Sequence, residues 1–227
     1  MQAKTAVLLG ATGLTGSYLL SLLLEDDRYE KIRVIVRKTI NPANPKLEEK
    51  IIDFSNEPAF RDAIGTGNII FCCIGTTMKS VKDDKTLYRK IDYDIAVNAA
   101  RWGAENGFSQ YLLISAVGAN ADSSNFYVQL KGETEKAIRA FSYASIFIFR
   151  PSLLMGKRKE KRIAEKIFQT IMPVFSFLMI GSLQKYRPIH ISTLAKAMQQ
   201  APFTNNEGVH IEEYQQILTL ANQDKYE

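Results

Sequence analysis

The chain has 227 residues, of which 46% are hydrophobic and 23% charged, which is typical of an ordinary soluble globular protein. The formal net charge is +5, but acidic and basic residues are interspersed along the chain. This pattern indicates a mild attraction to phosphates and argues against a nucleic-acid-binding protein. The length fits one full-sized domain better than two small ones.

The cysteines and the apolar segments point to the cytoplasm. Cys72 and Cys73 are adjacent and cannot join distant parts of a secreted chain, so we expect a reducing compartment. No signal-peptide pattern is present at the first residues. The apolar stretch 167–180 is interrupted by polar residues and is shorter than the ~20 residues of a spanning helix, so we expect no integral membrane segment.

Short apolar runs alternate with longer helical patterns through residue 150. Strands are expected at residues 6–10, 31–37, 50–54, 68–74, 110–115 and 145–149. Helices are expected at residues 16–25, 58–64, 84–106 and 125–141. This alternation predicts an α/β fold with a doubly wound parallel sheet, in which ligands bind beyond the carboxyl ends of the strands.

The pattern loosens after residue 151. Helices are expected near 159–174, 192–200 and 212–221, with a short strand near 209–211. We interpret residues 1–227 as one domain in which residues 152–227 form a lid on the substrate side.

Three glycines follow the first expected strand and open the first expected helix. Gly10 permits a tight turn, Gly13 allows the backbone to approach a pyrophosphate, and Gly16 allows close packing of helix and strand. The spacing GxxGxxG is typical of short-chain dehydrogenases. Three glycines alone would be weak evidence, but the strand before them and the helix after them favour a dinucleotide site.

The second expected strand ends in Arg37 and Lys38, where an NAD-selective site usually carries Asp or Glu. Two cations at this position favour a 2′-phosphate and therefore NADP(H), although they could also be solvated loop charges. Asp53 and Phe54 end the third strand and suit an adenine contact. The loop after the fourth strand should run along the ribose and nicotinamide, and it contains Cys73, Ile74, Gly75, Thr76 and Thr77.

Ser115, Tyr127 and Lys131 are the candidate catalytic residues. Tyr127 and Lys131 are four residues apart in a helical segment and share one face. A pair with this spacing arises by chance about once in such a chain, so its position carries the argument. Ser115 ends the fifth strand, at the same sheet edge as the glycine loop. The alternatives are a capping serine and a tyrosine on a helix surface.

These residue types suit the reduction of a carbonyl group. A phenol has a pKa of ~10, and a nearby ammonium group brings that pKa toward neutrality. Lys131 would supply this charge and bind the nicotinamide ribose, Ser115 would hold the carbonyl oxygen, and Tyr127 would donate a proton. The cofactor would deliver the hydride.

Pro151 ends the sixth strand at the edge where the nicotinamide is expected. Leu153 follows it, so this loop predicts an apolar cover over the cofactor. Within residues 152–180, a helix with one apolar face should form the lid or a contact with a second subunit.

The sequence resembles the atypical branch of the short-chain dehydrogenase/reductase superfamily, and more closely the Tat-interacting oxidoreductase-like family. The motifs that carry this resemblance are 71–77 (FCCIGTT), 123–126 (SSNF), 127–133 (YVQLKGE) and 149–151 (FRP). It implies a Rossmann fold, the catalytic roles of Ser115, Tyr127 and Lys131, and NADPH binding through Gly10, Thr12, Gly13, Leu14, Thr15, Gly16 and Arg37. One departure is Ala116, where the family often has a second serine.

The first functional hypothesis is therefore an NADPH-dependent reductase acting on a small-molecule carbonyl or alcohol. The alternative is an NADPH-binding regulatory protein that acts through a protein partner, as the resemblance implies for some relatives. No metal-binding pattern is apparent, and the basic run 157–162 is most simply the solvated start of a helix. A monomer and a homodimer are both compatible with the sequence.

Overall fold

Seven parallel strands form one central sheet in the computed structural model, which describes residues 3–40, 43–156, 181–204 and 206–223. The strands lie in the order β3-β2-β1-β4-β5-β6-β9, and every neighbouring pair is parallel. Their bounds are β1 Lys4–Leu9, β2 Tyr29–Val36, β3 Leu47–Ile51, β4 Ile69–Cys72, β5 Gln110–Ile114, β6 Ser145–Phe149 and β9 Gly208–Glu212. The predicted doubly wound parallel fold is confirmed.

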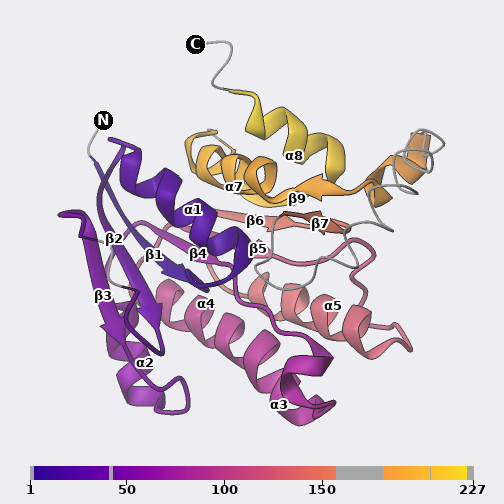
Figure 1. Cartoon of the computed structure of the whole chain (residues 1–227), viewed down its shortest axis with the longest axis horizontal. Helices are drawn as coiled ribbons and strands as arrows, with labels where there is room; N and C mark the ends of the chain where they lie inside the picture. The colour runs from indigo at the N-terminus through magenta and orange to yellow at the C-terminus, as the bar shows by residue number, and fades with distance from the viewer. Residues whose placement is uncertain (1–2, 41–42, 157–180, 205, 224–227) are drawn as a thin grey trace.

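Helices cover both faces of this sheet (Figure 1). On one face lie α1 Leu14–Glu25, α7 Ile191–Gln200 and α8 Tyr214–Ala221, and on the other lie α2 Glu57–Ile64, α4 Ile95–Glu105 and α5 Phe126–Ile138. Because both faces are covered, β4 and β6 are buried at every residue, which explains why all their residues but Ser145 are apolar. Two apolar layers, one on each side of the sheet, form the core.

The strand order reverses between β1 and β4. Successive strands run outward from β1 through β2 to β3, whereas β4, β5 and β6 continue on its other side. Ligands of doubly wound proteins bind at this reversal, beyond the carboxyl ends of the strands. The glycine loop after β1 and the loop after β4 meet there.

Two segments differ from the sequence-based expectations. The third strand spans Leu47–Ile51 and not 50–54, because its polar residues are held at the sheet edge, where Glu48 pairs with Arg33 of β2. The helix expected at 84–106 is divided into α3 Lys85–Arg89, a π-helical turn η2 Lys90–Asp94, and α4. A short 3₁₀ helix, η1 Met78–Val81, precedes it.

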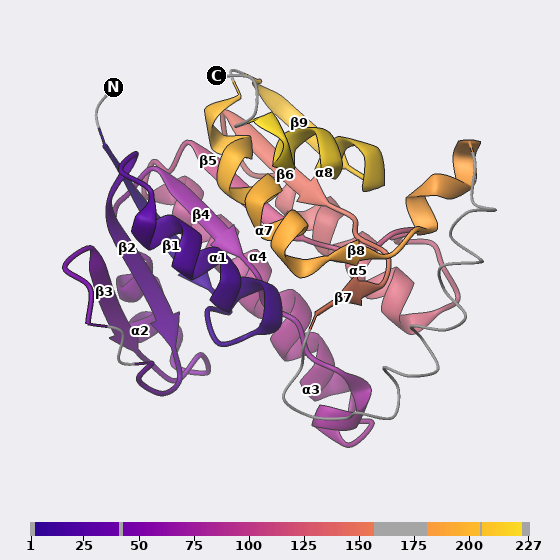
Figure 2. The same ribbon diagram turned by 45° about the horizontal axis from the view of Figure 1, so that its top comes forward.

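The chain after β6 adds a second, two-stranded sheet, which is not among the predicted elements. It pairs β7 Leu154–Met155 with β8 Ile189–His190 and lies beyond the carboxyl end of β6 (Figure 2). The 3₁₀ helices η3 Gly181–Tyr186 and η4 Ala201–Phe203 flank β8 and α7. The helix predicted near 159–174 lies outside the described residues, and the assignment of residues 152–227 as a lid stays a prediction.

Candidate functional site

The loop from β1 to α1 brings backbone groups into close contact. Gly10 has a φ of +82°, and a Cβ atom there would lie 2.5 Å from the carbonyl oxygen of Cys73. A Cβ atom at Gly16 would overlap the carbonyl oxygen of Gly10. Gly13 is the N-cap of α1, and because glycine has no side chain, no capping side chain occupies the first amides of the helix. The loop therefore fits a dinucleotide pyrophosphate.

The other predicted cofactor contacts at the ends of β1 and β2 differ in accessibility. Thr12 is exposed, Leu14 is half-buried and Thr15 is buried. Arg37 and Lys38 directly follow β2, and both are exposed. Their cations therefore lie at the strand end where the adenosine ribose binds in Rossmann proteins.

Asp53 and Phe54 follow β3 at the same sheet edge. Asp53 is exposed, and its carboxylate accepts a hydrogen bond of 2.9 Å from the amide of Ser55, which lowers the pKa of Asp53. Phe54 is half-buried and packs edge-on against Phe60 of α2, with 4.9 Å between ring centroids. The aspartate thus remains accessible, whereas the phenylalanine ring contributes to the core.

Two side chains hold the backbone of Thr76, in the loop after β4. The amide of Thr76 donates a hydrogen bond of 2.8 Å to Asp92 Oδ2, and its carbonyl oxygen accepts one of 3.2 Å from the Tyr88 hydroxyl. Thr77 caps η1 through Ser80. All five predicted cofactor contacts in this loop are exposed or half-buried, namely Cys73, Ile74, Gly75, Thr76 and Thr77.

Tyr127 and Lys131 lie one turn apart at the start of α5. Asn125 caps this helix by accepting the amide hydrogen of Val128, which fixes where the helix begins. Tyr127 is 43% exposed, whereas the Lys131 side chain is only 7% exposed. The phenol therefore faces accessible space above a buried ammonium group.

The buried partner of Lys131 is Asp92, which is not among the predicted site residues. Lys131 Nζ lies 3.0 Å from Asp92 Oδ1. Burial alone would lower the pKa of Lys131, but the charges of Asp92 and Tyr127 outweigh it and raise that pKa. One sequence signal existed: Asp92 stands between Tyr88 and Ala96 on a helix face that is otherwise apolar, where a carboxylate requires a partner.

Ser115 lies elsewhere in the site. Its buried hydroxyl donates a hydrogen bond of 2.6 Å to Glu135 Oε1, two turns beyond Tyr127 on α5. Glu135 also accepts hydrogen bonds from Arg150 and Arg139. The structure thus brings Tyr127 and Lys131 together, and it joins Ser115 to a separate polar cluster formed by β5, β6 and α5.

The predicted contacts Pro151 and Leu153 lie on the segment that leads from β6 to β7. The Pro151 carbonyl oxygen accepts the amide hydrogen of Val117, and the Leu153 carbonyl oxygen accepts that of Ile189, both at 3.0 Å. These bonds fix the segment beside the end of β5 and beside β8. The Leu153 side chain is exposed.

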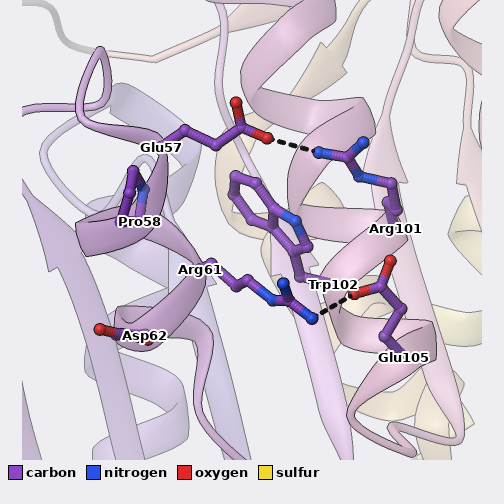
Figure 3. A pocket seen from close by; sticks show the side chains of 7 residues that line it. All are labelled: Glu57, Pro58, Arg61, Asp62, Arg101, Trp102 and Glu105. Atoms are coloured by element: carbon purple, nitrogen blue, oxygen red, sulfur yellow. Dashed lines mark hydrogen bonds and ion pairs between the residues drawn. The ribbon is translucent and has the colours of Figure 1, made fainter.

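A surface groove lies apart from these residues, between α2 and α4 (Figure 3). Trp102 forms its base, and the ion pairs Glu57–Arg101 and Arg61–Glu105 cross it at 2.8 and 3.0 Å. None of the residues that line the groove is a predicted site residue.

Residues 3–40, 43–156, 181–204 and 206–223 contain no group of three or more histidine, cysteine or acidic side chains arranged to bind a metal ion. Across those same residues, no helix is long and apolar enough to cross a membrane.

A family model described as NAD(P)H-binding matches residues 10–170. The chain belongs to this NAD(P)H-binding family. The match begins at the first glycine of the loop that fits a pyrophosphate, and it includes Tyr127, Lys131 and Asp92. The match supports a nicotinamide cofactor for this chain.

Curated relatives agree with this assignment. The chain is 33% identical over 168 residues to Protein fmp52, mitochondrial, of Aspergillus niger, covering 71% of each protein. It is 29% identical over 178 residues to Protein HTATIP2 of Rattus norvegicus, covering 75% of this chain and 73% of that protein. The predicted family, an atypical relative of the short-chain dehydrogenases, is confirmed.

Solved structures share the fold. The Bordetella bronchiseptica enzyme WbmH in complex with NAD+ has a TM-score of 0.70 at 15% identity, covering 93% of this chain and 76% of that one. A UDP-N-acetylglucosamine 4-epimerase from Methanobrevibacter ruminantium has a TM-score of 0.69 at 15% identity, covering 94% and 77%. At this identity the likeness concerns the fold alone.

Proposed function

We propose that this protein is an NADPH-dependent oxidoreductase that reduces the carbonyl group of an aldehyde, ketone or quinone to the alcohol level. The observation that carries the proposal is a continuous chain of contacts across the site. Lys131 pairs with Asp92, Asp92 binds the amide of Thr76, and Cys73 of the same loop contacts Gly10. Lys131, one turn from the proposed proton donor Tyr127, is thereby linked to the dinucleotide loop through the buried Asp92 carboxylate.

Tyr127 and Lys131 have different roles in the proposed carbonyl reduction. Tyr127, exposed at the start of α5, donates the proton to the carbonyl oxygen as the substrate carbon accepts hydride. The bound nicotinamide supplies that hydride and is oxidised. The phenolate left on Tyr127 is stabilised by the Lys131 ammonium group and regains a proton from solvent. Lys131 has three N–H donors, so two remain for the ribose hydroxyls after its bond to Asp92.

Ser115 is proposed as the residue that orients the substrate carbonyl. Since its hydroxyl donates to Glu135, it must turn away from that carboxylate to reach a substrate. We expect Ser115→Ala to lower kcat/KM about tenfold, the scale of one hydrogen bond to a charged group, without changing the Kd for NADPH. Steady-state kinetics and nucleotide titration of the variant would test this role. An unchanged kcat/KM would assign Ser115 to the Glu135 cluster alone.

The cofactor preference is proposed to rest on Arg37 and Lys38. We expect the protein to bind NADPH more tightly than NADH, because the guanidinium group of Arg37 pairs with the 2′-phosphate. Arg37→Asp replaces this cation with a repelling carboxylate and should remove or reverse the preference. Fluorescence titration of both nucleotides into both proteins measures it, with Arg61→Asp on α2 as a control for surface charge. Equal affinities in the unaltered protein would contradict the role of Arg37.

The function itself is tested by NADPH consumption with a panel of aldehydes, ketones and quinones. Turnover that depends on Tyr127 supports the proposal. Nucleotide binding without turnover of any carbonyl would instead favour a regulatory protein that senses NADPH.

We further propose a cytoplasmic location, supported by the two free cysteines Cys72 and Cys73. Because the fmp52 relatives are named mitochondrial, cell fractionation is the deciding experiment.

A further inference from the structure

Asp92 makes two buried contacts at the centre of the site. Its Oδ1 lies 3.0 Å from Lys131 Nζ, and its Oδ2 accepts the Thr76 amide hydrogen at 2.8 Å. The side chain is 1% exposed, so water cannot replace either partner. The carboxylate projects from the π-helical turn η2, which interrupts an otherwise α-helical segment. Single π turns of this kind occur frequently at functional sites.

Other titratable groups also face the Asp92–Lys131 ion pair. Tyr127 of α5 and Cys72 of β4 act on Lys131, and Tyr88 of α3 lies close enough to Asp92 and Tyr127 to respond to both. Burial raises the pKa values of Cys72 and Tyr88, which keeps both groups neutral near pH 7. Asp92, Lys131 and Tyr127 therefore determine the charge of the site.

We propose that Asp92 is a positioning residue that keeps Lys131 in its protonated, ammonium form. Tyr127 is then the group that exchanges protons with the substrate. The inference rests on the proposed reductase function, and it assigns Asp92 the role of determining which group carries the proton. Lys131 and Tyr127 lie one turn apart on α5, so the charge of one group acts on the other. When one of their two dissociable protons has left, the other proton lies either on the Lys131 nitrogen or on the Tyr127 oxygen. The negative charge of Asp92 favours the state with an ammonium group and a phenolate.

The same contact fixes the geometry of the cofactor loop. Since Oδ2 binds the Thr76 amide, the loop expected along the nicotinamide and the lysine expected on its ribose are held by one carboxylate. A displacement of Asp92 would therefore disturb both sides of the cofactor site together.

The pH dependence of kcat tests the electrostatic role. Carbonyl reduction requires a protonated Tyr127, so we expect kcat to fall toward high pH around a midpoint that the pH profile measures. Asp92→Asn removes a negative charge, which makes loss of a proton easier. We expect the midpoint to move down by about one pH unit, with a lower kcat at every pH. A purely structural role would lower kcat without moving the midpoint.

Asp94→Asn, two residues along the same turn, is the matched control and should leave the midpoint and kcat unchanged. A midpoint that stays in place in Asp92→Asn, or that moves equally in the control, overturns the proposal.

A double-mutant cycle tests the pair without any substrate. Lys131→Met leaves the Asp92 carboxylate buried and unpaired, and should lower the thermal unfolding midpoint by about 10 °C. Adding Asp92→Asn removes the unpaired charge and should restore most of this loss. Absence of restoration overturns the proposed pairing. If stability is restored but the unaltered protein reduces no carbonyl, the reductase function is refuted while the pairing of Asp92 with Lys131 stands.

Discussion

Tyr127→Phe is expected to lower kcat at least ~100-fold, the scale of losing a general acid, while the Kd for NADPH changes less than about twofold. The substitution removes only the hydroxyl of a side chain that is 43% exposed, so the helix and its buried lysine should be unaffected. Single-turnover reduction and nucleotide titration together separate the chemical step from binding.

Tyr18→Phe is the control for this experiment. Tyr18 is also 43% exposed, but it lies on α1, which carries no predicted proton donor. Its variant should retain full activity. If Tyr127→Phe turned over a carbonyl at the normal rate, Tyr127 would be an ordinary surface residue and the proposed mechanism would fail.

Glu135→Ala is expected to destabilise the protein by about 3–5 kcal/mol, the cost of breaking a buried ion pair by removing one partner. The Glu135 carboxylate is almost fully buried, and it accepts hydrogen bonds from Arg150, Arg139 and Ser115. Without it, the Arg150 guanidinium group, which is 20% exposed, loses its partner inside the protein. Urea unfolding measures the effect as a lower free energy of unfolding.

Glu133→Ala provides the matched comparison on the same helix. Glu133 pairs with Arg89 in a more exposed position, where ion pairs contribute about 0–1 kcal/mol. Equal losses in the free energy of unfolding of the two variants would show that removing any carboxylate from α5 destabilises the protein. The Glu135 cluster would then contribute no more to stability than a surface ion pair.

The sheet and the glycine loop at the end of its first strand were predictable because their signals are local. Buried parallel strands such as β4 and β6 are continuous apolar runs, and the glycine loop lies between a strand and a helix. The strand β3 was predicted too late in the chain because its polar residues form ion pairs at the sheet edge. Glu48 pairs with both Lys50 and Arg33, and a hydropathy pattern does not reveal such pairs. The two-residue strands β7 and β8 are too short to give a pattern.

The electrostatic partners in the site were not predictable, because they depend on contacts between residues far apart in the chain. Asp92 and Lys131 are separated by 39 positions, and Ser115 and Glu135 by 20. The sequence indicates that Ser115, Tyr127 and Lys131 lie near one sheet edge. Whether the Ser115 or the Tyr127 hydroxyl faces a substrate depends on which carboxylates lie nearby in the folded protein, and the sequence does not show this.

The π-helical turn at Lys90–Asp94 restricts which length changes this region can tolerate during evolution. A π turn contains one more residue than the α-helical turn it replaces, and each residue of an α-helix rotates the chain by about 100°. Deleting one residue here would give an unbroken helix with normal hydrogen bonding, yet it would turn Asp92 away from Lys131 and Thr76. Relatives that keep a paired aspartate should therefore conserve the number of residues between Asp84, which caps α3, and Gly103, which packs against Ile70.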